Sequence, residues 1–343
     1  MNVKKILPLF ILSGTLLLVT DLIHAQDIHF SQFYEAPLLR SPALAGIFTG
    51  DYRIQTIFRD QWNTFNNAYK TGSLSGEYKW PIGKGNDFLT TGMEILYDKA
   101  GTAALTTTEV MPALNYHKSL SNEKTTYLSV GFMGGLVQKT LDLSKVTTNN
   151  QYNGTAYDPA LPTGETITTP NIRYIDGALG ISFNTAFGED YKNTFYLSTG
   201  YYHLNRPRNS FYTDPTVELQ PKVVFSTGIH AIINDYVGFT IQADHSQQGS
   251  AQETIGGVMV SYKLGDDLST SNYVFNLGSY IRWGDAIIPV IKLESNAFTI
   301  GLSYDVNISS LQTASEGQGG FELSLSYTGF LEHENPRYFC PKF

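Results

Sequence analysis

The chain has little of three things that soluble proteins use freely. Cysteine occurs once in 343 residues, at Cys340, so neither an intrachain disulfide nor a zinc-thiolate cluster can form. The 23 Lys and Arg are outnumbered by 31 Asp and Glu, which argues against nucleic acid as a partner because phosphate contacts need clustered positive charge. Only 16% of residues are charged, too few to cover a large soluble protein in the usual way.

Long apolar runs are also missing after the beginning of the chain, which excludes a membrane-spanning helix of about 20 residues there. The beginning itself has Lys4 and Lys5, an apolar run ending at Val19 and the small residue Ala25. This order is typical of a secretory signal peptide and predicts cleavage between Ala25 and Gln26. A helix that anchors the chain is the alternative, but an aspartate interrupts the apolar stretch early.

What the chain has in abundance is aromatic residues, 22 Tyr and 20 Phe, in short segments where apolar and polar side chains alternate. In one of them Phe321, Leu323 and Leu325 alternate with Glu322 and Ser324. Alternation with a period of two gives a β-strand one apolar and one polar face. Such segments recur about fourteen times, near 51–59, 69–79, 88–98, 103–117, 124–139, 173–187, 193–204, 221–232, 236–244, 252–263, 272–283, 285–294, 296–305 and 319–330.

Six charged residues within these segments lie on the polar face of their strand: Glu94, Asp176, Asp244, Arg282, Asp305 and Glu322. A charge on the lipid face of a membrane strand costs about 2–4 kcal/mol near the midplane, so a membrane barrel would enforce this sorting. The polar face is otherwise rich in Gly, Ser, Thr and Asn, which suit a narrow lumen. Aromatic residues lie near strand ends, where membrane barrels carry aromatic girdles: Trp80, Tyr97, Tyr262, Trp283, Tyr304 and Tyr327.

The spacing of the segments gives a second indication of a barrel. The longest connections, 140–172, 205–220 and 306–318, all follow odd-numbered strands, as expected when short periplasmic turns alternate with longer outer loops. The predicted fold is therefore all-β, a transmembrane antiparallel β-barrel of about 14 strands over residues 51–330, with 12 or 16 strands as alternatives. The segment 285–294 is the least regular, because Pro289 cannot donate to a strand ladder.

Several stretches resemble a known family. They are QDIHFSQFYEAPLLRSPALAG at 26–46, FRDQW at 58–62, GYYHLNRPRNSF at 200–211, the block from SYDVN to ELSLSY at 303–327, and the terminal CPKF. Together they resemble the PorP/SprF family of outer-membrane proteins, which belong to the type IX secretion system of gliding and related bacteria. Position 60 is Asp where many relatives have Asn.

The resemblance implies a barrel without enzyme activity or cofactor in the outer membrane of a Gram-negative bacterium. With the N-terminus in the periplasm, the alternation of short turns and long loops predicts that the C-terminus lies there too. The implied role of the barrel is to support secretion or surface attachment of a large surface protein. The implied partners are outer-membrane lipid, an adhesin with a C-terminal secretion domain, and periplasmic or outer-membrane components of the machine. SprF-like and PorP-like roles both remain open. The polar lumen keeps a second hypothesis open, a diffusion channel for small solutes.

Two segments outside the barrel are candidates for contacts. Residues 26–50 are too irregular for a strand and form either a lead-in to the first strand or a plug or docking surface, since their aromatic side chains need burial. Residues 331–343 form a C-terminal periplasmic tail. Tyr and Arg are typical of protein interfaces, which makes the long outer loops and this tail the source of the candidate partner-contact residues Arg206, Arg208, Phe211, Tyr212, Phe339 and Phe343.

No catalytic or metal site is expected from the sequence. The histidines, among them His117 and His203, are scattered without an HExxH pair or an i, i+4 spacing, so they are interpreted as lumen or loop residues. The stretch GSLSG at 72–76 has Leu74 where a nucleophile elbow needs serine.

Overall fold

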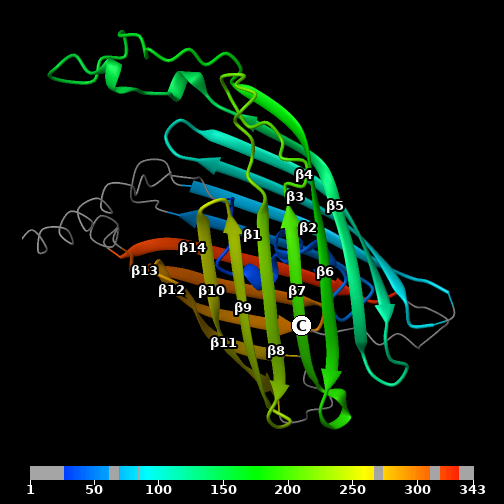
Figure 1. Ribbon diagram of the computed structural model, residues 1–343. Helices are drawn as coiled ribbons and strands as arrows, with labels where there is room; N and C mark the ends of the chain where they lie inside the picture. Colours follow the sequence, from blue (N-terminus) through cyan, green and yellow to red (C-terminus); the bar gives the residue numbers. More distant parts are fainter. Residues whose placement is uncertain (1–26, 62–68, 84, 266–272, 310–316, 332–343) are drawn as a thin grey trace, which may run out of the picture.

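The computed structural model describes residues 27–61, 69–83, 85–265, 273–309 and 317–331, in which the chain forms a closed antiparallel barrel of fourteen strands (Figure 1). Each strand pairs with its neighbour in sequence, and β14 pairs with β1 to close the barrel. The predicted fold class and strand number are confirmed. The strands are β1 Tyr52–Gln61, β2 Tyr69–Pro81, β3 Phe88–Ala100, β4 Leu105–Ser119, β5 Thr126–Thr140, β6 Asn171–Phe187, β7 Asn193–Tyr202, β8 Lys222–Ile232, β9 Val237–Gln248, β10 Ala251–Leu264, β11 Tyr273–Arg282, β12 Ala286–Ser295, β13 Phe298–Asn307 and β14 Gln318–Gly329.

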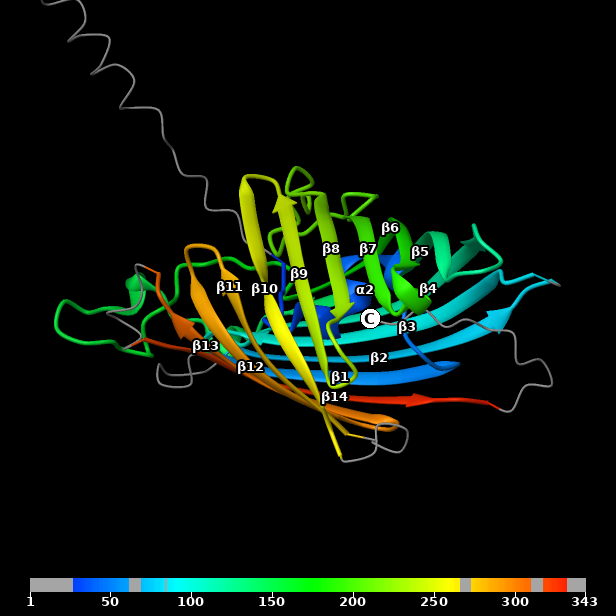
Figure 2. The ribbon, with the colours of Figure 1, turned by 90° about the horizontal axis from the view of Figure 1, so that it is seen from below.

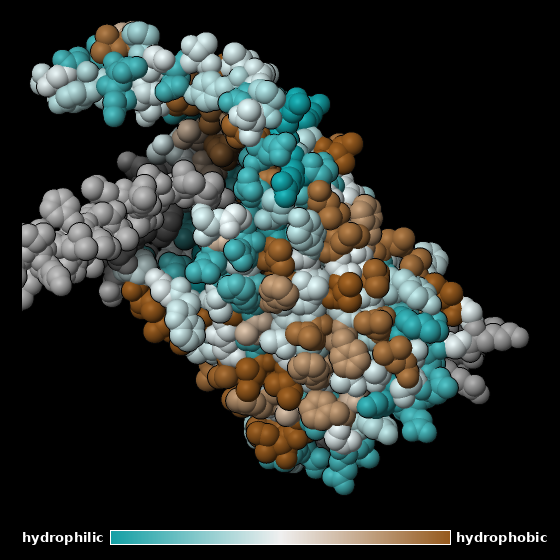
Figure 3. All heavy atoms as spheres, viewed as in Figure 1, coloured by the Kyte–Doolittle hydropathy of each residue, from teal (hydrophilic) through white to brown (hydrophobic). Residues whose placement is uncertain are grey.

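The alternation in sequence becomes an outer apolar face and an inner polar face. In β14, Phe321 and Leu323 are 42% and 40% exposed, whereas Glu322 between them is fully buried. The six charged residues predicted on polar faces are all buried inside the barrel. Figure 3 shows hydrophobic side chains spread over the outer surface of the strands, as a barrel surrounded by lipid requires. No helix in the described ranges is long and apolar enough to cross a membrane.

The segment 285–294, predicted to be the least regular, forms strand β12, and the pairing of this strand shows how Pro289 is tolerated. On one side Pro289 lies opposite Ser279 of β11. On the other side the ladder with β13 is interrupted between Ile287 and Val290. A proline in a sheet is tolerated where no hydrogen bond is required of its nitrogen, and the interruption provides such a place.

The connections divide the barrel into two unlike ends. One end, here called the long-loop rim, carries the connections 101–104, 141–170, 203–221, 249–250 and 283–285; the opposite rim carries the turns 82–87, 120–125, 188–192, 233–236 and 296–297. The connection 141–170 projects far from the barrel in Figure 1 and contains two short 3-10 helices, η5 Leu143–Lys145 and η6 Asn149–Gln151. A third, η7 Glu189–Tyr191, lies at the opposite rim.

Exposed aromatic residues gather near both rims. Tyr97, Trp283 and Tyr304 lie toward the long-loop rim, and Trp80 and Tyr262 lie toward the opposite one. Trp and Tyr prefer the level where lipid headgroups meet hydrocarbon. The two aromatic bands therefore mark both edges of the membrane-spanning zone.

Candidate functional site

The interior of the barrel is occupied by residues 27–50, here called the inner segment. It contains three short helices, η3 Phe33–Glu35, α2 Pro37–Arg40 and η4 Pro42–Leu44. Every one of its residues is buried or half-buried. Figures 1 and 2 show it, in blue, enclosed by strands on all sides. Its side chains and backbone contact strands on opposite walls, so it spans the lumen.

Arg40 is the first of several anchors. Its Nε and NH2 donate to the two carboxylate oxygens of Asp244 in β9, both at 2.7 Å, and NH2 also donates to the Tyr196 hydroxyl of β7. The guanidinium lies 5.1 Å from the centre of the Phe33 ring. Arginine and carboxylate are both buried, and a two-bond pair of this kind fixes geometry as well as charge. Arg40 therefore fixes α2 against the β7–β9 wall.

A second anchor lies on the opposite wall. The backbone N–H groups of Ser31 and Gln32 donate to the two carboxylate oxygens of Glu322 in β14, at 2.6 and 2.7 Å. Arg59 of β1 also bonds Glu322 and reaches Asp305 of β13 at 3.0 Å. An isolated carboxylate in this interior would be costly, and the guanidinium and backbone donors offset that cost.

Three glycines on neighbouring strands form a trough for the backbone of the inner segment. Gly131 of β5, Gly180 of β6 and Gly200 of β7 lie directly opposite one another across the sheet. A Cβ at Gly131 would come within 2.4 Å of the Pro42 carbonyl carbon, and one at Gly180 within 2.3 Å of the Ser41 hydroxyl oxygen. Only a wall without side chains at these three positions admits the segment this close.

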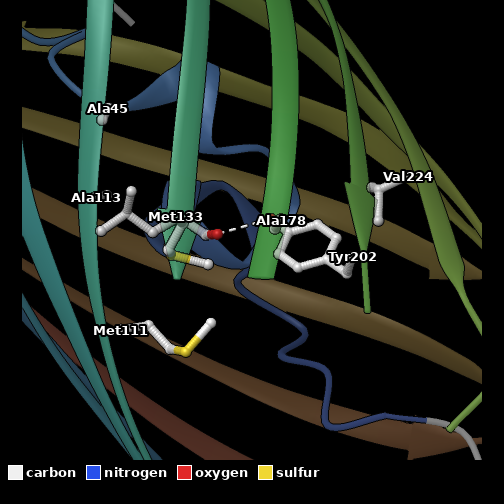
Figure 4. Packing of buried hydrophobic residues seen from close by; sticks show 8 residues of the cluster. Ala45, Met111, Ala113, Met133, Ala178, Tyr202 and Val224 are labelled. Atoms are coloured by element: carbon white, nitrogen blue, oxygen red, sulfur yellow. Dashed lines mark hydrogen bonds between the residues drawn. The ribbon is translucent and has the colours of Figure 1, made fainter. Parts of the chain in front are cut away.

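Hydrogen bonds fix the segment over the trough. Asn115 of β4 donates from its amide nitrogen to the carbonyl oxygens of Ala43 and Ala45, at 2.9 and 2.8 Å. The Ser182 hydroxyl of β6 donates to the Ala43 oxygen at 2.7 Å. Apolar packing continues beside it, where Ala45 meets a cluster with Met111, Met133 and other strand residues shown in Figure 4.

The beginning of the inner segment is held by a histidine between two carboxylates. His203, immediately after β7, lies 2.7 Å from an oxygen of Asp27 and 2.5 Å from an oxygen of Asp176 in β6. Burial alone would lower the pKa of His203, but its hydrogen bonds to Asp176 and Asp27 outweigh burial and raise the pKa to about 9. The pKa of Asp27 is lowered, because Lys222 and His203 favour its charged form more than burial opposes it. At neutral pH His203 is therefore protonated and Asp27 is ionised.

We expect the beginning of the inner segment to loosen at alkaline pH. Because the pKa of His203 rises from 6.5 to about 9 on folding, the stabilisation is complete below pH 6.5 and is lost as the pH passes 9. Hydrogen exchange of residues 28–33, corrected for the intrinsic rate, should accelerate about tenfold or more between pH 6.5 and 10. The variant His203→Gln carries no charge and should exchange fast at both values. An unchanged pH profile in that variant would show that another group is responsible.

The predicted partner-contact residues fall in two places. Arg206, Arg208 and Tyr212 are exposed and Phe211 half-buried, all in the connection 203–221. The predicted cleavage residues Ala25 and Gln26, and Phe339 and Phe343 of the tail, lie outside the described residues.

The connection 203–221 is bound to the other long connection, 141–170. The Thr169 N–H donates to the Phe211 carbonyl oxygen at 3.1 Å, and the Tyr212 hydroxyl donates to the Glu165 carboxylate at 2.7 Å. The backbone of Arg208 forms an isolated antiparallel β-bridge with that of Glu218 within the same connection. The structure thus brings these predicted residues onto one surface, here called the loop platform, made of residues 141–170 and 203–221.

Sequence reasoning missed the roles of Arg40, His203 and the glycine trough. The charged residue in an otherwise apolar PLLRSPAL stretch, and a glycine in each of three predicted strands, were the available signals. In the described part of the chain no group of three His, Cys, Asp or Glu side chains is placed to hold a metal ion.

The closed barrel, its apolar outer face and its aromatic bands define the class of protein as an outer-membrane β-barrel. The chain belongs to the PorP/SprF family of type IX secretion system membrane proteins, whose family model matches residues 23–327. No curated protein matches the chain significantly.

Solved structures resemble this fold at low identity. The toluene transporter TbuX of Ralstonia pickettii is 10% identical with a TM-score of 0.52, over 87% of this chain and 94% of that one. A FadL homologue of Pseudomonas aeruginosa is 8% identical with a TM-score of 0.48, over 85% of this chain and 94% of that one. At such identities the likeness to TbuX shows the fold alone.

Proposed function

We propose that this protein is a non-enzymatic accessory barrel of the type IX secretion system that supports secretion or cell-surface attachment of one large, adhesin-like surface protein. The observation that carries the proposal, together with the family, is the inner segment across the lumen. A fourteen-stranded barrel is already narrower than the porins that pass small solutes, and the inner segment crosses the lumen of this one. The barrel therefore serves as a docking or anchoring site and is no conduit for a folded protein.

The loop platform is the surface that we assign to the partner, an adhesin with a C-terminal secretion domain. It exposes Tyr152, Tyr157 and Tyr212 together with Arg206 and Arg208. Tyr and Arg contribute a large share of the binding energy at protein interfaces. With both termini in the periplasm, this rim faces the outside of the cell, where a retained surface protein would be held.

Deletion of the gene tests the secretion role. We expect loss of one or a few large proteins from the cell surface, with the other secreted proteins unchanged, measured by a comparison of surface and periplasmic protein inventories. Collapse of all type IX secretion would instead identify a core component of the machine. An unchanged inventory would contradict the proposal.

The double variant Arg208→Ala/Tyr212→Ala tests the platform. We expect normal barrel levels but a loss of the surface partner of about tenfold or more, because alanine removes two interface anchors worth about 1–2 kcal/mol each. Tyr191→Ala is the matched control, since Tyr191 is an exposed tyrosine at the opposite rim. Equal loss of the partner in the control variant would refute a specific role for the platform.

A small-solute channel is the second candidate, and one observation favours it. Asn184 of β6, Thr194 of β7 and Ser226 of β8 are buried on the inner face, yet their side-chain polar atoms have no hydrogen-bond partner among the described residues. Buried groups of this kind are normally satisfied by water, which indicates hydrated space beside the inner segment. Stable conductance of the intact purified barrel in a planar bilayer would support this candidate.

A further inference from the structure

We propose that the outer surface of the barrel binds a phosphate-bearing lipid headgroup at the long-loop rim, over β2–β6. The site is separate from the lumen and borders the loop platform where η5 meets the barrel wall. It does not depend on the secretion role. Lys70 and Lys99 are its central residues. The argument starts from the strand register, because directly paired residues point to the same face of a sheet.

Three successive outward-facing rows run around β2–β6 toward the rim. The first is apolar: Leu74, Ile95, Val110, Leu136 and Ile175, all exposed to the outside. The second is mixed: Gly72, Tyr97, Thr108, Gln138 and Arg173. The third is polar and basic: Lys70, Lys99, Thr106, Thr140 and Asn171. The rows thus pass from hydrocarbon depth, through the level of the aromatic band, to headgroup depth.

The third row contains an unbalanced pair of charges. Lys70 and Lys99 lie directly opposite each other on β2 and β3, an arrangement that destabilises a sheet. In the described part of the chain the ammonium group of neither lysine has an ion-pair or hydrogen-bond partner. Asp60 of β1 is on the same outer face opposite Lys70 but makes no ion pair with it among the described residues. An anion held between the lysines would relieve the repulsion.

A depression beside Lys99 offers room for such an anion. It has a volume of about 600 Å³ and is lined by Tyr97, Lys99, Thr106 and Thr140 of the barrel wall and by Lys145 of η5. Lysine ammonium and threonine hydroxyl groups are phosphate donors. Lys145 is paired with Asp142 at 3.0 Å, so the net positive charge comes from Lys99 and its neighbour Lys70.

The position of the depression selects a lipid over a soluble phosphate compound. Tyr97 and the apolar row lie directly below the lysines on the same face, where acyl chains of a lipid would pack. Arg173 lies in the same outward row as Tyr97 and donates to Gln138 at 3.0 Å, which adds a third positive charge facing the membrane. A headgroup phosphate at the lysines with its chains along the apolar row satisfies both features.

Titration of the full mature chain with bis-phosphorylated lipid A in detergent micelles, followed by native mass spectrometry, tests the proposal. We expect Lys70→Gln/Lys99→Gln to bind about tenfold or more weakly, since each lysine near a membrane surface contributes about 1 kcal/mol toward an anionic lipid. Lys70→Arg/Lys99→Arg keeps the charge and should bind like the parent. Lys118→Gln removes an exposed lysine at the opposite rim and should also leave binding unchanged.

Three outcomes would overturn the proposal. They are equal binding by the glutamine double variant, equal binding of lipid A stripped of its phosphates, and full displacement of the lipid by inorganic phosphate alone, which would make the site a simple anion site. Retained heat-modifiable migration of each variant on gels establishes that the barrel is folded.

Discussion

Deletion of residues 28–50 is expected to turn the barrel into a conducting pore. The inner segment contacts opposite walls of the lumen and is buried or half-buried along its whole length, so its removal leaves a water-filled channel lined by charged side chains. The expected result in planar bilayers is discrete conductance steps from the deletion variant, with none from the intact chain. The same steps from the intact chain would show that the segment does not close the lumen, and would favour the diffusion-channel candidate.

A single substitution gives a milder form of the same test. Arg40→Leu leaves the Asp244 carboxylate buried without the guanidinium that bonds both of its oxygens. Removing one partner of a buried ion pair costs about 3–5 kcal/mol. The remaining anchors at Glu322 and Asp27 keep part of the segment in place, so we expect brief openings in this variant. Lys118→Leu, which removes the ion-pair partner of Asp87 at the opposite rim and away from the segment, is a control for barrel damage.

The second large effect is expected at the glycine trough. A valine at Gly180 would place its Cβ 2.3 Å from the Ser41 oxygen and 2.9 Å from the Ala43 nitrogen. Both atoms belong to the segment, whose Ala43 carbonyl oxygen accepts hydrogen bonds from Asn115 and Ser182, so the segment can move away only by breaking these bonds. Overpacking of a tight interior costs about 1–3 kcal/mol or more, and we expect the segment to be displaced.

Thiol labelling measures that displacement. In a chain carrying Cys340→Ala and Ser41→Cys, the introduced thiol occupies a fully buried position and should react slowly with a soluble maleimide. Adding Gly180→Val should accelerate labelling about tenfold or more. Gly76→Val is the matched control, because no atom lies within 4 Å of a Cβ at that glycine. Slow labelling in the Gly180 variant would mean that the wall yields and the segment stays.

The segment would loosen at its beginning and at its middle for different reasons. The end at Asp27 depends on the charge of His203, which lies in the left-handed backbone region at φ 59° and is held there by two carboxylates. The middle at Arg40 depends on a guanidinium that stays charged at every accessible pH. Of these two anchors, alkaline pH therefore weakens only the one at Asp27, and the segment is expected to open from its beginning.

The sequence by itself determined the barrel. Alternation with period two is a local property of a strand. In β14 it shows by itself that Phe321 faces lipid and Glu322 faces the lumen, without knowledge of the neighbouring strands. The same local signal placed fourteen strands, the inward charges and the long connections. It also predicted the strand that contains Pro289. The missing N–H of this proline is accommodated because the ladder with β13 is interrupted there.

Only the tertiary structure decided what fills the lumen. Arg40 meets Asp244 across 204 positions, and Ser31 meets Glu322 across 291. Nothing in the sequence around Arg40 or Ser31 indicates which distant residue each one contacts. The glycines at 131, 180 and 200 form a trough because the register aligns three strands, and register is a property of paired strands. Local periodicity reflects the environment of one strand face. The position of the inner segment depends instead on contacts between distant residues, which form only when the barrel is closed.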